Sequence, residues 1–315
     1  MAAMPPIPTL ADIRAAAARI APFAHRTPVL SSRSIDAMAG ARVVFKCENL
    51  QKVGAFKFRG ACNAVMALSD DEARLGVATH SSGNHAAALA LAARLRGVPA
   101  YIIMPSNAPA VKRAAVEGYG GRITFCEPTL AAREAALREV VAETGAAFVH
   151  PYDNPYVIAG QGTAALELLE EVPNLDTVVV PVGGGGLVSG TAIAVTSLYS
   201  ARVIGVEPEA ADDARRSLEA GVILPSNDPK TIADGLRTSL GEIPFEVARK
   251  RVSSIVAVSE EAIGRAMRTV WERMKIIIEP SSAVPVAAIL EGKIRGERIG
   301  VILSGGNVDL GKLPF

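Results

Sequence analysis

Four consecutive glycines are the first feature of this sequence that could do chemistry. Gly183, Gly184, Gly185 and Gly186 follow an apolar run, residues 177–180, that is typical of a buried parallel strand, and they precede a segment that tolerates a helix. Without side chains, the amide groups of this loop and the positive end of the helix can converge on an anion. Four glycines cost more backbone entropy than a routine turn requires, so the pattern predicts a phosphate site.

The same strand, loop and helix also resemble a dinucleotide-binding unit. Glu207, after the next apolar run, lies about where a ribose-binding acid is expected. However, the spacing Gly-x-Gly-x-x-Gly does not fit residues 183–190. A nicotinamide-dependent oxidoreductase therefore stays as an alternative.

The second feature is Lys57, which lies between Phe56 and Phe58 at the expected start of a helix that runs to about Leu68. A lysine flanked by aromatic residues usually lies solvated over apolar neighbours. If it is desolvated instead, its pKa falls, which a lysine that forms a Schiff base requires. A phosphate loop together with a buried lysine indicates pyridoxal phosphate.

The third feature is a polar loop between an expected strand, residues 76–80, and the helix that follows it; the loop consists of Ser81, Ser82, Gly83, Asn84 and His85. Its side chains could simply cap the helix, but the same geometry suits a substrate carboxylate.

An acidic cluster over residues 207–213 also leaves two alternatives open. It could be a negatively charged helix N-terminus, or it could hold Mg²⁺ or Ca²⁺ through carboxylates and a backbone carbonyl.

Strands and helices alternate regularly from Gly76. We expect strands at 76–80, 100–105, 122–126 and 147–150, and helices at 86–95, 110–117 and 130–143. This alternation predicts an α/β fold with parallel sheets, helices on both faces, and ligands beyond the carboxyl ends of the strands. A glycine-rich segment at 159–163 is expected to start a further helix. The chain then divides into a large domain, residues 1–75 and 153–315, and a small mobile domain, residues 76–152.

Composition limits the partners. The 33 Lys and Arg residues nearly balance the 32 Asp and Glu residues, so no strong field draws the chain to nucleic acid or to an anionic membrane. Cys47, Cys62 and Cys126 have no metal-like spacing and fit a reduced setting. No signal peptide or membrane span is expected. We expect a cytoplasmic protein whose partner is a small molecule.

Taken together, six segments resemble the fold-type II pyridoxal-phosphate enzymes, and more narrowly the serine racemase and serine/threonine dehydratase family, which includes 3-hydroxyaspartate dehydratases. The match runs through nearly the whole chain, at residues 54–60 (GAFKFRG), 81–85 (SSGNH), 158–163 (IAGQGT), 183–187 (GGGGL), 271–275 (WERMK) and 303–307 (LSGGN). The resemblance implies a tryptophan synthase β-like fold of two lobes, each a mostly parallel sheet flanked by helices. It also implies a homodimer.

The resemblance assigns roles to the cofactor residues. Lys57 would carry the internal aldimine and take the substrate α-proton, and Asn84 would donate to the pyridoxal 3-oxygen. Ser304 would face the pyridine nitrogen, where a hydroxyl does not keep the nitrogen protonated and so favours loss of a β-hydroxyl. The full cofactor set is Phe56, Lys57, Asn84, Gly183, Gly184, Gly185, Gly186, Leu187 and Ser304.

The resemblance assigns substrate and metal residues too. Ser82 matches a hydroxyl on the opposite face of the substrate from the lysine, which racemisation needs and elimination can do without. The substrate set is Ser81, Ser82, Gly83, Asn84, His85 and Arg133, whose fork could bind a carboxylate in bidentate fashion. A divalent-metal triad maps onto Glu207, the Ala211 carbonyl and Asp213, for Mg²⁺ or alternatively Ca²⁺ or Mn²⁺.

Two departures from the family pattern could reshape the pocket: Tyr152 replaces a polar residue of the best-known racemases, and residues 282–284 replace a smaller, glycine-containing turn. No regulatory module is expected after Phe315.

The sequence thus predicts a pyridoxal-phosphate-dependent ammonia-lyase that eliminates water and ammonia from an L-3-hydroxy amino acid. Serine and threonine are the default substrates, and 3-hydroxyaspartate is a close rival because Arg133 could serve a second carboxylate. A serine racemase and, from another class, an NAD-dependent oxidoreductase are the alternatives.

Overall fold

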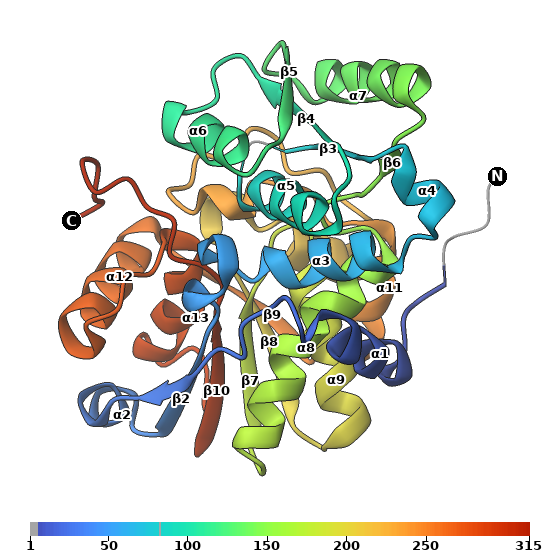
Figure 1. Ribbon diagram of the computed structural model, residues 1–315. Helices are drawn as coiled ribbons and strands as arrows, with labels where there is room; N and C mark the ends of the chain where they lie inside the picture. The colour runs from blue at the N-terminus through green and yellow to red at the C-terminus, as the bar shows by residue number, and fades with distance from the viewer. Residues whose placement is uncertain (1–5, 82) are drawn as a thin grey trace.

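The computed structural model describes residues 6–81 and 83–315. Within these residues the chain forms two β-sheets in different parts of the molecule, with helices packed around both (Figure 1). Among the helices of this described part, none has both the length and the apolar character that crossing a membrane requires. The predicted α/β class is confirmed.

The larger sheet has the strand order β1-β2-β10-β7-β8-β9. All neighbouring strands run parallel except β1, which is antiparallel to β2. The central strands β7 and β10 are apolar and almost entirely buried, as expected for a parallel sheet covered on both faces. The strands are β1 (Val29–Ser31), β2 (Arg42–Cys47), β7 (Thr177–Pro181), β8 (Arg202–Pro208), β9 (Ser254–Val258) and β10 (Arg298–Leu303).

Helices cover both faces of this sheet (Figure 1), and on each face the helices and the sheet enclose one apolar cluster. One face carries α1 (Leu10–Ile20), α8 (Pro155–Glu171), α9 (Gly186–Leu198) and α11 (Glu242–Arg251). The other face carries α2 (Arg33–Ala39), α12 (Glu260–Met274) and α13 (Pro280–Leu290). Helix α10 (Asp213–Ala220) follows β8, and short 3₁₀ turns occupy Glu48–Leu50, Lys52–Gly54, Glu209–Ala211 and Asp234–Leu236.

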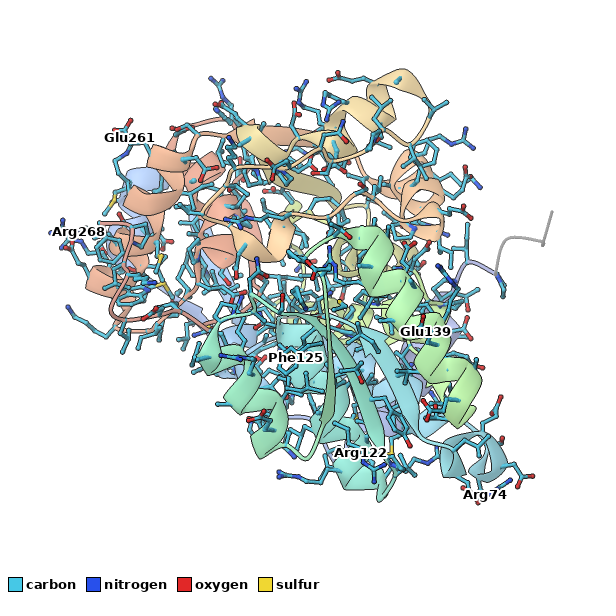
Figure 2. The ribbon with its side chains drawn as sticks, turned by 90° about the horizontal axis from the view of Figure 1, so that it is seen from above. Arg74, Arg122, Phe125, Glu139, Glu261 and Arg268 are labelled. Atoms are coloured by element: carbon cyan, nitrogen blue, oxygen red, sulfur yellow. The ribbon has the colours of Figure 1, made fainter. Side chains whose placement is uncertain are left out.

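The smaller sheet is parallel throughout, with the order β5-β4-β3-β6. Its strands are β3 (Val77–His80), β4 (Ala100–Pro105), β5 (Arg122–Cys126) and β6 (Ala147–Phe148), the last shorter than the expected 147–150. Helices α3 (Lys57–Ala67), α5 (Asn84–Arg96) and α6 (Ala110–Gly118) share one apolar cluster, and α7 (Leu130–Thr144) packs on another; α4 (Asp70–Arg74) precedes β3. Figure 2 shows the smaller sheet and its helices in front, with Arg122 and Phe125 of β5 at the surface. The mobility of residues 76–152 as a separate domain stays a prediction.

The glycine-rich segment at 159–163 does not start a helix, so that prediction is wrong. Helix α8 already begins at Pro155, and the Asn154 side chain caps it. The glycines lie inside α8 because neighbouring helices approach too closely for a side chain. A Cβ on Gly160 would lie 2.6 Å from the carbonyl oxygen of Arg59 in α3, and one on Gly162 would lie 2.9 Å from that of Gly190 in α9.

Candidate active site

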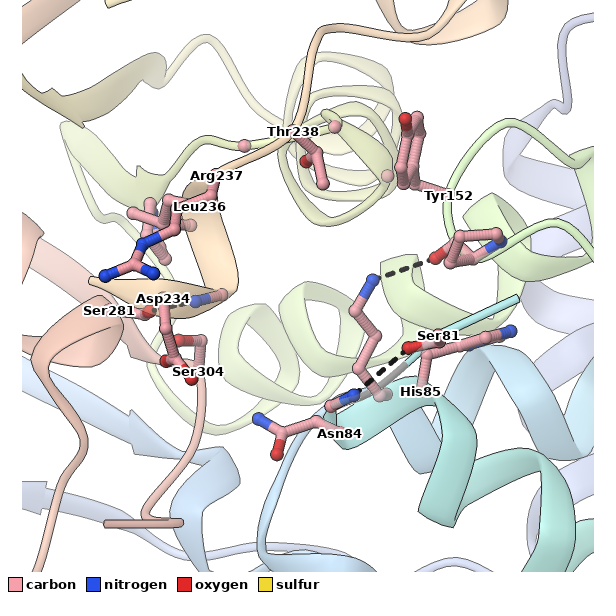
Figure 3. A pocket seen from close by; sticks show the side chains of 18 of the residues that line it. Ser81, Asn84, His85, Tyr152, Asp234, Leu236, Arg237, Thr238, Ser281 and Ser304 are labelled. Atoms are coloured by element: carbon pink, nitrogen blue, oxygen red, sulfur yellow. Dashed lines mark hydrogen bonds between the residues drawn. The ribbon is translucent and has the colours of Figure 1, made fainter. Parts of the chain in front are cut away.

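A cavity of about 640 Å³ is lined by residues from both sheet-bearing parts of the chain. Figure 3 shows Ser81, Asn84 and His85 on one side of it and Ser304 on the other. Among its lining residues are these predicted cofactor and substrate residues: Phe56, Lys57, Ser81, Gly83, Asn84, His85, Arg133, Gly183, Gly184, Gly185, Gly186, Leu187 and Ser304. Ser82 lies outside the described residues. The three predicted metal-binding residues lie elsewhere.

Lys57 is the first residue of α3, and its side chain reaches the cavity. The Nζ atom donates a hydrogen bond to the carbonyl oxygen of Pro151 at 2.8 Å and lies 5.2 Å from the centre of the Phe56 ring. Burial lowers the pKa of Lys57 to about 8, against an opposing effect of the nearby Glu279 carboxyl. A useful fraction of the amine is therefore uncharged, and thus nucleophilic, near neutral pH.

The segment before Lys57 is fixed to the loop that follows β10. The two stretches run antiparallel, so each holds the other in place through main-chain groups. Ala55 and Gly305 form a β-bridge, Phe56 N–H donates to the Ser304 carbonyl at 2.9 Å, and Gly306 N–H donates to the Gly54 carbonyl at 2.9 Å. The lysine and Ser304 consequently reach the same cavity from adjoining segments.

A buried ion-pair network holds the first turn of α3. The Arg59 guanidinium is fully buried and donates to the carboxylates of Glu48 and Glu167, at 2.7 Å in each case. Glu167 also accepts from Lys46 Nζ at 2.6 Å. Hydrogen bonding to Arg59 and the positive charges around it keep the pKa of the Glu167 carboxyl below its usual range, although burial acts in the opposite direction. Arg59 therefore ties the helix that carries Lys57 to the 3₁₀ turn after β2 and to α8.

The glycine run forms a loop at the N-terminus of α9. Gly185 is the N-cap residue with φ 89°, and no side chain in the described part of the structure caps this helix end. A Cβ on Gly183 would lie 2.9 Å from Leu236 Cα, and one on Gly184 would lie 2.4 Å from the Tyr152 ring. Neighbours therefore press on the loop so closely that only glycine fits, while its main chain lines the cavity.

Asn84 begins α5 and is held by two partners. Its amide nitrogen donates to both oxygens of Glu279, at 3.1 and 3.2 Å, and its amide oxygen accepts from Asn307 Nδ2 at 2.9 Å. Burial raises the pKa of Glu279 to about 7, and Asp234 adds to the effect. Sequence reasoning missed Glu279 as a site residue, because a glutamate just before Pro280 indicates only the cap of α13.

Ser304 follows β10 and is buried beside Ser282, with 3.1 Å between the two hydroxyl oxygens. The Ser282 hydroxyl accepts from the N–H of Gly305 and donates to its carbonyl, both at 2.6 Å. Ser282 lies in α13 and belongs to residues 282–284, which are expected to depart from the family pattern. Ser282 thus contacts the hydroxyl of Ser304, which is predicted to face the cofactor.

The pKa values of the histidines near the cavity, His80, His85 and His150, all lie below the usual range. His85 is buried, with Nε2 3.3 Å from the Val149 carbonyl oxygen, and burial together with Lys57 holds its pKa well below the usual range. Burial lowers the pKa of His150 to about 3, and its Nδ1 accepts the N–H of Asp153 at 2.8 Å. Tyr152 packs edge-on against His150, with ring centres 4.5 Å apart. Positive charge for a substrate must therefore come from lysine or arginine.

Arg133 and Lys112 line the cavity from the part of the chain that carries the smaller sheet. The Arg133 Nε donates to the Thr129 carbonyl at 3.4 Å. Lys112 Nζ is paired with Asp234, which lines the cavity from the opposite part. This cavity wall offers cationic groups that suit carboxylates.

Comparison with known proteins decides the family. Residues 20–305 match the family described as "Pyridoxal-phosphate dependent enzyme". The chain belongs to this family. It is 51% identical over 312 residues to the beta-hydroxyaspartate dehydratase of Paracoccus denitrificans, covering 98% of this chain and 99% of that relative. It is 52% identical over 310 residues to the serine racemase of Oryza sativa subsp. indica, covering 96% and 91%.

The structural comparison agrees with the sequence comparison. The structure of maize serine racemase superposes with a TM-score of 0.95 at 49% sequence identity, covering 97% of this chain and 95% of that one. The predicted fold type and family of pyridoxal-phosphate-dependent enzymes are therefore confirmed, and the nicotinamide alternative is wrong.

The cavity suits pyridoxal phosphate, the cofactor of this family. A Cβ on any of the first three glycines of the loop would meet a neighbour at 2.9 Å or less, so the loop is built as a side-chain-free cradle. The uncapped N-terminus of α9 adds the positive end of a helix, which favours a phosphate. Lys57 supplies an amine of lowered pKa in the same cavity.

The acidic cluster fits a hard cation in part. Both oxygens of Glu207 accept main-chain N–H groups at the start of α10, from Ala214 at 3.0 Å and Arg215 at 2.9 Å. Asp213 Oδ2 accepts from Leu240 N–H at 3.1 Å, whereas its buried Oδ1 has no partner among the described residues. Burial raises the pKa of Glu207 to about 8 and that of Asp213 to about 6.

The side chains near Glu207 and Asp213 limit the ligands that such a cation could have. No group of three or more His, Cys, Asp or Glu side chains in the described ranges could hold a metal ion. The two carboxylates would therefore need a backbone oxygen, such as the Ala211 carbonyl, or water to complete the oxygen ligands that Mg²⁺ and Ca²⁺ prefer. The orphaned Asp213 oxygen fits this arrangement, and the Glu207 contacts fit the helix-capping alternative.

Proposed function

We propose that this pyridoxal-phosphate-dependent enzyme is an ammonia-lyase that removes water and ammonia from an L-3-hydroxy amino acid and leaves a keto acid. One observation carries the proposal: a lysine of lowered pKa, a side-chain-free phosphate cradle and cationic side chains all line one cavity. The name of the Paracoccus relative, a beta-hydroxyaspartate dehydratase, supports the same reaction class.

Pyridoxal phosphate, when bound, supplies an electron-withdrawing ring that stabilises negative charge at the substrate α-carbon. Lys57 would take the α-proton, because an amine with a pKa of about 8 is partly uncharged near neutral pH. Asn84 would donate to the ring 3-oxygen. Ser304 would face the ring nitrogen without protonating it, which favours loss of the β-hydroxyl over a long-lived carbanion.

Among 3-hydroxy amino acids, the cavity favours one with a second carboxylate. Arg133 and Lys112 both line it; Lys112 is already paired with Asp234, and the guanidinium fork of Arg133 suits bidentate binding of a carboxylate. A substrate with a single carboxylate needs fewer of these groups. We therefore propose 3-hydroxyaspartate as the preferred substrate, ahead of serine and threonine.

Serine racemase activity is the second candidate, and the rice relative, a serine racemase at 52% identity, favours it. Racemisation needs a proton donor and acceptor on the face opposite Lys57, the role predicted for Ser82. Incubation with L-serine followed by chiral chromatography separates the candidates. D-serine formed faster than pyruvate would favour the racemase.

Three further properties belong to the proposal. A structural Mg²⁺, or Ca²⁺ or Mn²⁺ in its place, would be held by Glu207, the Ala211 carbonyl and Asp213, supported by the orphaned Asp213 oxygen. The enzyme would be cytoplasmic, and it would be a homodimer, an oligomeric state that light scattering coupled to gel filtration tests. Residues 76–152 would move as a small domain over the substrate.

A substrate panel tests the proposed function. Purified protein loaded with pyridoxal phosphate is mixed separately with L-serine, L-threonine and the L-threo and L-erythro isomers of 3-hydroxyaspartate, and keto acid and ammonia are measured. Lys57→Ala should lose activity by about 10²- to 10⁴-fold, the usual contribution of a positioned acid or base. Lys52→Ala is the matched control, because Lys52 also lies over a phenylalanine, 5.7 Å from the Phe58 ring centre, but its side chain serves no proposed step. No keto acid from any substrate would overturn the lyase proposal.

A further inference from the structure

Asn307 closes the last of the six family-like segments, yet the proposed function gives it no role. Its side-chain nitrogen carries two hydrogens, and each has an acceptor. One goes to the carbonyl oxygen of Val53 at 2.7 Å, and the other goes to the amide oxygen of Asn84 at 2.9 Å. Because a main-chain carbonyl can only accept, the atom facing Val53 must be the nitrogen, which fixes the orientation of the Asn307 amide.

That orientation fixes the amide of Asn84 as well. The Asn84 oxygen must face the donating nitrogen of Asn307, so the Asn84 nitrogen lies on the other side, where it donates to the Glu279 carboxylate at 3.1 and 3.2 Å. A single hydrogen serves this forked contact. Asn84 lines the cavity (Figure 3), so we expect its second N–H to be left for the space inside.

Asn307 is itself held rigidly. Its main-chain N–H donates to Glu279 Oε2 at 3.2 Å, so the carboxylate that receives Asn84 also receives Asn307. Gly54, with φ 69°, leaves the room that Asn307 needs, because a Cβ there would lie 2.6 Å from Asn307 Oδ1. The neighbouring Val53 has φ 56°, an unfavourable conformation for a β-branched residue, and its carbonyl is the one that Asn307 binds.

We infer that Asn307 is a positioning residue that turns an N–H of Asn84, and not its carbonyl oxygen, toward the cavity. The inference rests on the proposed function, in which Asn84 donates to the 3-oxygen of pyridoxal phosphate. With Asn307 in place, an anionic oxygen at that point meets a donor. Without it, only Glu279 opposes a rotation of the Asn84 amide that would present a repelling oxygen instead.

The test measures binding of pyridoxal phosphate to the cofactor-free protein by absorbance titration. Hydrogen bonds to charged groups contribute enough that Asn307→Ala should weaken binding by about 10- to 100-fold. Asn307→Asp, which keeps the shape but replaces the donor by an acceptor, should weaken it at least as much. An analogue with hydrogen in place of the 3-hydroxyl should bind equally well to the wild type and to both variants, because it lacks the oxygen that Asn84 serves.

A double-mutant cycle separates positioning from a purely structural role. In an Asn84→Ala background, Asn307→Ala should cause no further loss of affinity for pyridoxal phosphate, although thermal stability falls in both backgrounds through the lost Val53 contact. Asn49→Ala is the matched control. Asn49 is a nearby buried asparagine that donates to the Ile277 carbonyl at 2.9 Å, and its loss should not distinguish the cofactor from the analogue.

The outcomes separate the two proposals. If the wild-type protein binds no pyridoxal phosphate, the proposed function fails. If it binds the cofactor, but Asn307 variants lose the cofactor and the analogue to the same degree, or lose further affinity in the Asn84→Ala background, or lose none at all, only the positioning role of Asn307 is overturned.

Discussion

Replacing Gly184 by alanine is a direct test of the phosphate cradle. A Cβ at this position would lie 2.4 Å from two ring atoms of Tyr152 and 2.5 Å from a third. Such contacts do not occur between real atoms, so either the ring or the loop must move. The ring is not free to move without loss, because Tyr152 packs edge-on against His150 at 4.5 Å between ring centres.

The expected cost follows from this geometry. Overpacking a well-packed site typically destabilises by about 1–3 kcal/mol. If the loop moves instead of the ring, its amide groups leave the phosphate position, and the cofactor should bind about tenfold or more weakly because bonds to a charged group are lost. We therefore expect Gly184→Ala to lose stability in the cofactor-free protein and affinity in the titration.

Two further variants make the assay specific. Removing the ring with Tyr152→Ala should make the added methyl tolerable, so that Gly184→Ala costs at least about 1 kcal/mol less in that background. Gly118→Ala is the matched control, because a Cβ at the end of α6 would meet nothing within 4 Å. Stability comes from urea unfolding of cofactor-free protein, and affinity from absorbance titration. The reasoning fails if Gly184→Ala matches Gly118→Ala in both measurements, or if removing the ring gives no relief.

Four other predictions follow from charged groups. With a pKa of about 8 in place of its usual 10.5, Lys57 should attach pyridoxal phosphate at a rate that rises about tenfold per pH unit up to about pH 8 and then levels off; stopped-flow absorbance that keeps rising to pH 10 would contradict this. The same shift makes cofactor-free protein more stable as the pH rises from about 8 to 10.5, because over that window the unfolded chain binds more protons. Mg²⁺ should raise the melting temperature of the chelator-treated wild type but not of Asp213→Asn, and an equal rise in both would remove Asp213 from the site. Arg59→Ala should destabilise by about 3–5 kcal/mol in urea unfolding, since it leaves buried carboxylates without their partner, and a loss below about 1 kcal/mol would show that the network matters little.

The parts of the site that the sequence predicted are those whose chemistry is local. A strand, four glycines and a helix follow one another without interruption, so β7, the loop and α9 could be placed from residue types alone. Lys57 at the start of α3 was predicted in the same way. The beginning of α8 was not, because the glycines at 160 and 162 indicated a helix start, whereas they lie inside the helix where α3 and α9 press against it.

The parts that the sequence could not predict depend on neighbours that are distant in the chain. Glu279 precedes a proline at a helix start, and nothing in that pattern distinguishes a cap from a cavity residue. Burial and the nearby Asp234 raise its pKa to about 7, and its contact with Asn84 places it at the cavity. The pairing of Lys112 with Asp234 across the cavity is likewise invisible until the two parts of the chain are brought together.

The order of strands in the larger sheet explains why segments as distant in the chain as Val53 and Asn307, 254 residues apart, meet at one cavity. Strand β10 lies between β2 and β7, and all three run in the same direction. Their carboxyl ends therefore deliver three loops side by side: the Lys57 segment after β2, the loop of Ser304 and Asn307 after β10, and the glycine loop after β7. The middle loop touches the Lys57 segment through main-chain bonds, and its Asn307 reaches Asn84 of α5 from the smaller sheet.

The positions of the three loops depend on the register of β10 against β2 and β7. Leu303 pairs with Cys47 and Val301 pairs with Val179, so the loops begin at matching heights along the sheet. A slip of β10 by one residue would turn each of its side chains to the opposite face and would move Ser304 away from both the lysine and the glycines. Close packing opposes such a slip, because a Cβ at the position of Gly300 would lie 2.6 Å from Leu175 Cδ1. Core packing of one central strand thus sets the distance between the amine and the phosphate cradle, the relation on which the proposed chemistry depends.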